Sequence, residues 1–239
     1  MGMSERCNIM DYLKNVYPEK FTTEDNTFRE IQRGNKIFIG TGAGEPRYLV
    51  RSLMDYLNRN PNAFFDADIF YLWTLDKSEY FYEKYKRNFR INSFFIGDPN
   101  REGINKGDAD YTPVFTSIIP ELFERKSFPI DIALVQTSLP DEHGYFNLGV
   151  NVDIVKAAVE NAALIIVQVN SYMPRVHGDG FIHINDIDFI IPYDEPLPEY
   201  DPSDDSVAAL QIGKYVASLV QDGDTIQIGY GGIPFAVLS

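Results

Sequence analysis

The sequence is poor in several features that mark particular classes of protein. Cysteine occurs once, as Cys7, which excludes an internal disulfide and is typical of a reducing compartment. The longest apolar run, residues 162–167, is far shorter than the roughly 20 residues of a membrane-spanning helix. The first 20 residues carry early charges and no apolar core, so they do not predict a signal peptide. Together these features predict a cytoplasmic protein that does not enter the membrane.

Positive charge is also scarce. The chain has 21 Lys and Arg residues against 35 Asp and Glu residues, which gives a net charge of −14 and a pI of about 4.6. Nucleic-acid binding requires a basic face, so we expect no nucleic-acid partner. An anionic small molecule is still compatible with this charge, because backbone N–H groups can hold an anion locally.

Histidine is rare as well, and recognisable nucleophiles are missing. His177 and His183 lie near Asp179, but two histidines without a convergent third ligand are more often structural, and we expect no metal site. The sequence contains no Gly-x-Ser-x-Gly elbow, and Cys7 lies in a terminal segment. The sequence therefore offers no catalytic nucleophile.

What is present is an alternation of apolar strands and amphipathic helices. Strands are predicted at 36–40, 68–73, 130–138 and 163–170, and residues 91–97 are predicted to form a strand or a loop. Helices are predicted at 47–59, 78–89, 117–125 and 152–161. Strands that are apolar on both sides indicate an α/β fold with an open, mainly parallel sheet covered by helices on both faces.

Composition divides the chain into four parts. We expect an N-terminal tail over 1–26 and a first α/β domain over 27–192. The acidic, proline-rich stretch 193–205 predicts a linker. Residues 206–239 then begin a second domain, with a helix over 206–220 that Ser203 or Asp204 caps.

The second domain is predicted from an internal duplication. Residues 31–50 and 219–238 match at an offset of 189 positions up to the glycine loop. The loop of the second stretch is one residue shorter, so the offset after it is 188. The matching pairs are Gly34 and Gly223, Ile37 and Ile226, Ile39 and Ile228, Gly40 and Gly229, Gly42 and Gly231, and Pro46 and Pro234. Ordered matches of glycine and proline indicate a repeated unit. We therefore expect the start of a similar, truncated second α/β domain.

Glycine loops follow the predicted strand of each copy, at 40–46 and 229–234. Glycine lets a ligand approach the backbone, and a helix N-terminus favours negative charge there. Tight turns between a strand and a helix also need glycine, so either loop alone is a weak signal. The spacing Gly40-x-Gly42-x-Gly44 differs from the dinucleotide fingerprint, which disfavours a nucleotide-dependent dehydrogenase.

A turn-rich loop, 138–149, follows the strand predicted at 130–138. Ligands of open α/β sheets bind at the carboxyl ends of strands, so the polar groups of Ser138, Asp141 and His143 are candidate substrate contacts. A solvated turn is an equally good interpretation of the same residues.

Three motifs in order, VQTSLPDEHGYFNLG, QVNSYMPRVHGDGFIH and DGDTIQIGYGGIPFAVL, resemble the acetyl-CoA hydrolase/transferase family, in particular its 4-hydroxybutyrate and butyrate:acetate CoA-transferases. The resemblance runs from about residue 27 to the last residue. It implies two similar α/β domains and a homo-oligomer of the full-length protein. It also implies ping-pong transfer of CoA from an acyl-CoA to a short-chain carboxylate through a glutamyl-CoA intermediate, with no permanently bound cofactor.

The resemblance also implies roles for particular residues. The nucleophilic glutamate follows the motif at 229–234, and no residue of this chain matches it, so we expect residues 1–239 alone to be inactive. The backbone of the second loop lines the acyl and CoA site, through Gly229, Gly231, Gly232 and Pro234. The facing wall for the carboxylate substrate comprises Gly42, Gly44, Glu45, Pro46, Ser138, Asp141 and His143. Leu139 stands where the family often has a second proline.

Two other functions stay open from the sequence. The chain could be a non-catalytic subunit that completes a site with a separate chain, or a nucleotide-binding dehydrogenase domain. A natural split between subunits is expected in the linker at 193–205, but the sequence continues past it into the second glycine motif, which argues against the first alternative. The spacing of the glycines in the loop argues against the second.

Overall fold

The computed structural model describes residues 3–75, 83–200 and 206–238. The chain divides into two units, Met1–Pro198 and Glu199–Ser239. Each unit is described by itself.

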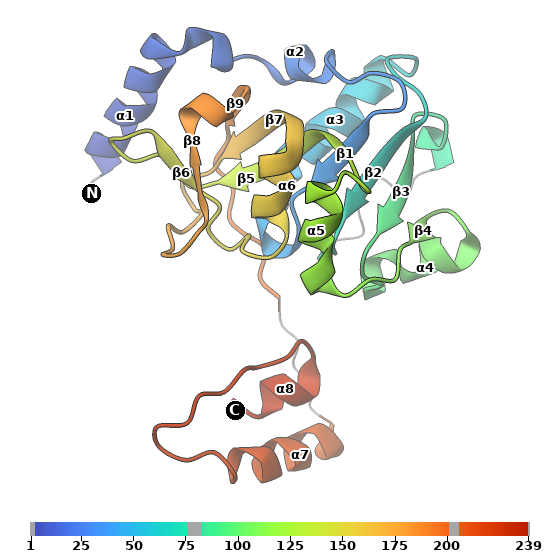
Figure 1. Cartoon of the computed structure of the whole chain (residues 1–239), viewed down its shortest axis with the longest axis vertical. Helices are drawn as coiled ribbons and strands as arrows, with labels where there is room; N and C mark the ends of the chain where they lie inside the picture. The colour runs from blue at the N-terminus through green and yellow to red at the C-terminus, as the bar shows by residue number, and fades with distance from the viewer. Residues whose placement is uncertain (1–2, 76–82, 201–205, 239) are drawn as a thin grey trace. The chain divides into compact units, whose positions relative to one another are not determined.

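Unit 1 is built on a parallel sheet, as the sequence predicts. Among the described residues, seven strands run in the order β4-β3-β2-β1-β5-β7-β9, and all neighbours are parallel (Figure 1). The strands are β1 (Lys36–Ile39), β2 (Ala67–Tyr71), β3 (Phe89–Ser93), β4 (Asp110–Tyr111), β5 (Ile130–Thr137), β7 (Ala162–Val169) and β9 (Phe189–Pro192). An antiparallel pair, β6 (Tyr145–Asn147) and β8 (Phe181–His183), lies outside this sheet.

Helices cover both faces of the sheet (Figure 1). One face carries α5 (Ile119–Glu124) and α6 (Val155–Asn161), and the other carries α2 (Glu24–Phe28) and α3 (Arg47–Arg59). The remaining helices in the described part of unit 1 are α1 (Met3–Val16), α4 (Asp98–Lys106) and the short 3₁₀ turns η1 (Pro18–Lys20), η2 (Gly42–Gly44), η4 (Glu83–Tyr85), η5 (Thr116–Ile118) and η6 (Ile184–Asp186).

The alternation of side chains along β1 shows why its sequence is apolar throughout. Ile37 and Ile39 face the core beneath α3, whereas Phe38 faces the opposite core and packs on Phe70 and Phe123 at ring distances of 5.9 and 6.0 Å. Consecutive residues therefore bury into different layers, which is the pattern of a strand covered on both sides.

The N-terminal segment differs from the predicted tail. It contains α1 and η1, and the side chain of Leu13 is only 5% exposed and belongs to the core. Phe21 forms a parallel bridge to Ile190 on the outermost strand. The segment thus packs on unit 1, because its apolar side chains cover the edge that β9 would otherwise expose.

The helix predicted at 78–89 is also not as expected. Residues 76–82 lie outside the described residues, residues 83–85 form only a 3₁₀ turn, and Phe89 already begins β3. Phe89 and Ile91 are each 3% exposed, so this aromatic-rich stretch is held in the sheet by burial.

The first part of the predicted linker packs on unit 1. The side chain of Glu195 is 15% exposed and bonds to α3 and β7, whereas residues 201–205 lie outside the described residues. In unit 2, α7 (Val207–Ala217) is capped by Ser206, whose hydroxyl accepts from the Ala209 N–H at 3.2 Å. Ser203 and Asp204, which were predicted for that role, lie outside the described residues.

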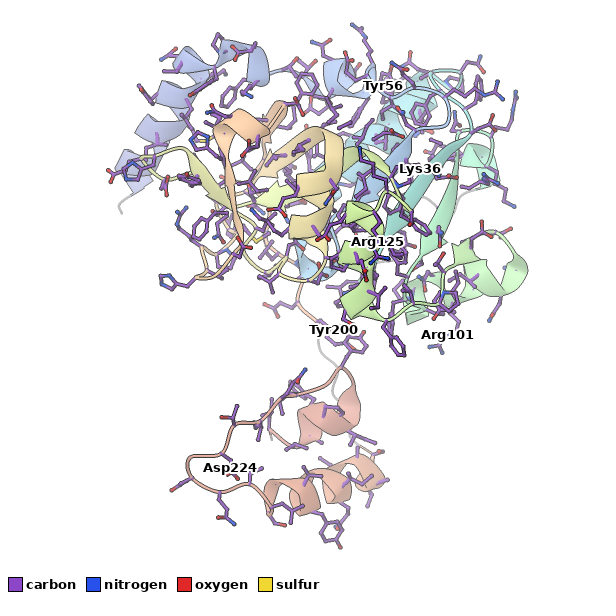
Figure 2. The ribbon with its side chains drawn as sticks, in the orientation of Figure 1. Lys36, Tyr56, Arg101, Arg125, Tyr200 and Asp224 are labelled. Carbon is purple, nitrogen blue, oxygen red and sulfur yellow. The ribbon has the colours of Figure 1, made fainter. Side chains whose placement is uncertain are left out.

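Unit 2 holds α7 and α8 (Gly232–Ala236) against each other. The contact is close, because a Cβ added at Gly213 would lie 2.3 Å from the carbonyl oxygen of Ala236. Asp224 lies in the turn that follows α7 (Figure 2). No strand is assigned over 224–229, although the sequence predicts one there.

Candidate functional site

The loops at the carboxyl edge of the sheet form the candidate site. In a parallel sheet these loops share one edge, and ligands of open α/β sheets bind there. The loop segments are 40–46 after β1, 72–74 after β2, 138–143 after β5, 170–172 after β7 and 193–196 after β9.

The loop after β1 needs glycine for close packing. Gly42 has φ of +58°, its N–H donates to the Trp73 carbonyl at 3.0 Å, and an added Cβ would lie 2.8 Å from the Trp73 ring. At Gly44 an added Cβ would lie 2.1 Å from Oδ1 of Asn151, whose amide donates to the Gly44 carbonyl at 2.8 Å. Both glycines are therefore required by their neighbours inside unit 1.

Glu45 and Pro46 complete this loop. The Glu45 residue is 7% exposed, and the Thr74 hydroxyl donates to its carboxylate at 2.6 Å. Pro46 occupies the cap position of α3. The Glu45 carboxylate is therefore buried and held in place by a neighbouring loop.

The N-terminus of α3 is already occupied by the chain itself. The Tyr48 N–H donates to Oε1 of Glu195 at 3.0 Å, and the Leu49 N–H donates to Oε1 of Gln168 at 3.4 Å. Burial raises the pKa of Glu195, but the hydrogen bonds from Arg51 and Gln168 together lower it by more. The pKa of Glu195 therefore lies below its ordinary value. The negative charge at this helix N-terminus is thus that of the Glu195 side chain. A dinucleotide phosphate would have to displace it.

The loop after β5 is a hydrogen-bonded turn. Ser138 is 4% exposed and its hydroxyl donates to the Leu139 carbonyl at 2.9 Å. One oxygen of Asp141 accepts from the N–H groups of His143 and Tyr145 at 3.0 and 2.9 Å, and the other accepts from Arg175 at 2.6 Å.

The same loop leaves His143 on the surface. Its side chain is 73% exposed, and its charged neighbour is Glu142, at 3.6 Å. Within the part of the chain that the structure describes, the side-chain hydrogen bonds of Asp141 and Ser138 stay in the region 138–175 and do not reach the loop at 42–46. The structure thus brings the predicted residues to one edge of the sheet as two separately stabilised loops.

A cluster of buried amides was not identified from the sequence. Gln136, Gln168 and Asn170 are each at most 1% exposed. The Gln168 and Asn170 amides donate to Oε1 of Gln136 at 3.2 and 2.8 Å. The sequence carried a signal for this cluster, because β5 and β7 each have a glutamine near the carboxyl end of an otherwise apolar strand. The two glutamines are paired in the register of the sheet.

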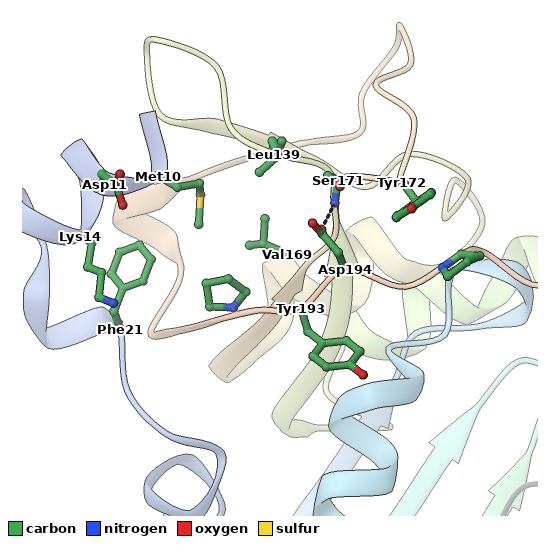
Figure 3. Close-up of a pocket in the computed structure, with 12 residues that line it drawn as sticks. Met10, Asp11, Lys14, Phe21, Leu139, Val169, Ser171, Tyr172, Tyr193 and Asp194 are labelled. Atoms are coloured by element: carbon green, nitrogen blue, oxygen red, sulfur yellow. Dashed lines mark hydrogen bonds between the residues drawn. The ribbon is translucent and has the colours of Figure 1, made fainter. Parts of the chain in front are cut away.

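A cavity of about 790 Å³ lies beside these loops, under α1 (Figure 3). Its wall includes Met10 and Lys14 from α1, Leu139 after β5 and Val169 at the end of β7. The hydrogen bond from the Ser171 N–H to Asp194, 2.7 Å long, crosses its rim. The volume is within the range of small-ligand sites. The sequence did not predict this cavity, because α1 was expected to be a tail.

The second glycine loop lies in unit 2. Gly231 has φ of +131° and precedes α8, whose first residues are Gly232 and Ile233. Pro234 contacts the position where a Cβ at Gly229 would lie, at 3.6 Å. The loop therefore has the turn that the sequence predicts, with its backbone at the surface of this unit.

The histidines do not form a metal site in the described residues, where no group of three or more metal-binding side chains occurs. His183 stacks edge-on against Tyr145 at 4.8 Å, and its Nδ1 accepts from the Asn185 N–H. Within 3–75, 83–200 and 206–238, the helices are too short or too polar to cross a bilayer.

Comparison with known proteins places this geometry in a family. The model of the acetyl-CoA hydrolase/transferase N-terminal domain matches residues 4–199. The 4-hydroxybutyrate coenzyme A transferase of Clostridium kluyveri is 40% identical over 93% of this chain and 51% of its own length. A succinyl-CoA:acetate/propanoyl-CoA:succinate CoA transferase of Fasciola hepatica is 37% identical over 93% of this chain and 46% of its own length.

Solved structures of similar proteins have the same fold as this chain. RipA from Yersinia pestis superposes with a TM-score of 0.82 at 30% identity, over 93% of this chain and 53% of its own. A 4-hydroxybutyrate CoA-transferase from Porphyromonas gingivalis gives a TM-score of 0.71 at 31% identity, over 95% of this chain and 52% of its own. The chain spans about half the length of the curated relatives it matches. The chain therefore belongs to the acetyl-CoA hydrolase/transferase family, and residues 4–199 correspond to the family's N-terminal domain.

Proposed function

We propose that this chain provides one wall of the active site of a CoA-transferase, which moves CoA from an acyl-CoA to a short-chain carboxylate. The observation that carries this proposal is the 40% identity to a 4-hydroxybutyrate coenzyme A transferase over 93% of the chain. The position of the loop at 42–46, at the carboxyl edge of the sheet, supports it.

The proposed reaction begins when a glutamate carboxylate attacks the thioester carbonyl. The C–S bond breaks, the CoA thiolate leaves, and a mixed anhydride forms. The thiolate then attacks the glutamyl carbonyl, which gives a glutamyl-CoA thioester and releases the first carboxylate. The second carboxylate reverses these steps. CoA is thus a substrate, and the scheme uses no resident cofactor or metal.

We place this glutamate outside residues 1–239. Three carboxylates of the described carboxyl edge already have structural roles, because Glu45 is buried against Thr74, Asp141 fixes its own turn and Glu195 caps α3. A nucleophile must reach the thioester carbon within bonding distance, which these positions do not favour.

The remaining roles concern the backbone. We assign to the N–H groups of Gly231 and Gly232 the stabilisation of the oxyanion that forms during attack, where one donor contributes about 3–4 kcal/mol. Gly229 and Pro234 shape that turn. The loops at 42–46 and 138–143 contact the carboxylate substrate. A second α/β domain that begins at residue 206 and a homo-oligomer of the longer protein are parts of the same proposal.

The test compares residues 1–239 with a form that continues through a second half of the length seen in the relatives. Each is incubated with butyryl-CoA and isotope-labelled acetate. We expect labelled acetyl-CoA only with the longer form, together with a CoA-sized adduct on one glutamate beyond residue 239. Replacing that glutamate with alanine should remove both signals.

Four results would contradict the proposal or a part of it. Exchange by residues 1–239 alone, or an adduct on one of their own carboxylates, would refute the placement of the nucleophile. A longer form that folds and yields only hydrolysed butyryl-CoA would identify a hydrolase in place of a transferase, and if activity appears only after a separate chain is added, the protein is a subunit of a split enzyme.

A further inference from the structure

The segment that follows β9 is fastened to unit 1 by its side chains. Oε1 of Glu195 accepts from the Tyr48 N–H and from the Gln168 amide, both at 3.0 Å, and Oε2 accepts from Arg51 at 2.7 Å. The Glu195 side chain is 15% exposed. A carboxylate at the N-terminus of a 13-residue helix is favoured by the helix dipole as well as by the bonds themselves.

The neighbouring residues bind to the same surface. The Asn170 amide donates to the Glu195 carbonyl at 2.6 Å, and the Glu195 N–H donates back to Asn170 at 3.3 Å. The ring of Tyr193 stacks on Tyr48, with centroids 3.6 Å apart and planes 6° apart. Asp194 accepts from the Ser171 N–H. Three successive residues, 193–195, are therefore held against α3 and the end of β7.

The other end of this network reaches the candidate substrate loop. Gln168, which donates to Glu195, also donates to Gln136, and the Gln136 amide donates to the Glu45 carbonyl at 3.3 Å. These side chains are buried, so the hydrogen bonds between them have little competition from water. The chain of contacts thus runs from Glu195 to the loop at 42–46.

We propose that Glu195 is a positioning residue that holds the loop at 42–46 and the exit of the chain from unit 1 in one fixed arrangement. The proposal deepens the proposed function and rests on it, since the loop at 42–46 is the wall assigned there to the carboxylate substrate. Glu195 acts through α3 and the amide cluster and does not touch the reacting atoms.

Trp73 supplies a readout that does not depend on activity. It is the only tryptophan in the sequence, and its ring packs on Gly42, the first residue of the loop. If Glu195 positions this loop, loss of its carboxylate should change the environment of Trp73 in the folded protein. A residue that affects only overall stability would leave the emission of the folded state unchanged.

The variants are Glu195→Ala, Glu195→Gln and the matched control Glu199→Gln, at an exposed glutamate four residues away. We expect Glu195→Ala to shift the Trp73 emission maximum and to raise the exchange rate of the Tyr48 amide proton at least roughly tenfold. Glu195→Gln should give intermediate values, because its amide can still accept from Tyr48 but presents donors to Arg51. The control should match the parent.

A pH titration of the parent protein gives the same answer without a substitution. The pKa of Glu195 is lowered in the folded state, below its ordinary value of 4.5. The stabilisation that the Glu195 carboxylate provides is therefore present at neutral pH and is lost as the pH falls through that lowered pKa. Trp73 emission should change there in the parent and in Glu199→Gln but not in Glu195→Gln, while circular dichroism shows that the protein stays folded. This arm decides the proposal if Glu195→Ala does not fold.

Unchanged Trp73 emission and Tyr48 exchange in the folded Glu195 variants would overturn the proposal. In the longer form, we expect Glu195→Gln to raise the KM for the carboxylate several-fold with a smaller effect on kcat. A changed emission with unchanged KM would overturn the link to the substrate while leaving the proposed function intact. A parent without transfer activity would refute the proposed function, and the emission and exchange data would still decide the role of Glu195.

Discussion

Residues 31–50 and 219–238, here called the first and second copies, share one turn in different surroundings. The first copy lies in unit 1 and the second in unit 2. In both, the turn before the strand position uses a glycine with positive φ, +77° at Gly34 and +94° at Gly223. At neither glycine would an added Cβ meet another atom within 4 Å, so the backbone conformation alone accounts for the residue.

A side chain at the matching position also closes each turn. In the first copy the Gln32 N–H donates to the Asn35 side chain at 2.7 Å, and in the second the Gln221 N–H donates to the Asp224 side chain at 2.8 Å. The two pairs are separated by the same 189 positions as the glycines. This recurrence lies outside the glycine and proline matches, and it supports the interpretation that the two copies are one repeated unit.

Burial is where the copies differ. Ile37 and Ile39 are 0% and 1% exposed, because β2 and β5 flank β1 and α3 covers it. Their counterparts Ile226 and Ile228 are 49% and 38% exposed, and no strand is assigned over 224–229. Local sequence therefore suffices for the turn, whereas the strand requires neighbouring strands and a covering helix.

The largest expected difference concerns the matched isoleucines. Ile37→Ala should lower the free energy of unfolding by about 2–5 kcal/mol, because it leaves a cavity in a packed core. Ile226→Ala should change it by less than about 0.5 kcal/mol, as for a surface substitution. Urea unfolding followed by circular dichroism measures both, and equal losses would show that the second copy is packed as well as the first.

A smaller difference is expected at the second glycine of each loop. Alanine strains the backbone at both Gly42 and Gly231, by about 1–3 kcal/mol. Only Gly42→Ala also pushes a Cβ to within 2.8 Å of the Trp73 ring, which adds about 1–3 kcal/mol of overpacking. We expect a shifted Trp73 emission with Gly42→Ala and an unchanged one with Gly231→Ala. A shift with both would mean that the two loops share an environment.

The smallest effect should be the same in both copies. Asn35→Ala and Asp224→Ala each remove one hydrogen bond, with a net contribution of about 0.5–1.5 kcal/mol. The amide protons of Gln32 and Gln221, respectively, should exchange faster by a similar factor. Asn35→Asp and Asp224→Asn, which exchange the residues of the two copies, should keep the bond. An effect confined to one copy would break the structural equivalence.

The sequence was sufficient to predict the parallel sheet, because runs such as 130–138 and 163–170 are apolar on both faces and allow few other structures. It was not sufficient for the start of β3, because the helix predicted at 78–89 includes Phe89, whose burial by distant parts of the chain places it in the sheet. In the same way, the sequence of α1 is typical of a polar tail, and only the contact of Leu13 with the core shows that the helix packs on unit 1.

The candidate site shows the same division. Its glycine loops were predicted from local spacing. Glu195 was not identified as part of it, because an acidic residue among prolines is typical of a linker, and its partners Tyr48 and Gln168 are 147 and 27 residues away. Contacts of this range have no signature in a local window of sequence.

The central claim is that the two copies share the turn before the strand position but only the first is built into a sheet. Hydrogen exchange of the amide protons at 36–39 and at 225–228, in the 239-residue chain, tests it directly. We expect exchange at 36–39 to require opening of unit 1, and exchange at 225–228 to lie within about tenfold of an unstructured peptide. Equal protection of the two segments in a protein that sedimentation shows to be monomeric would contradict the claim.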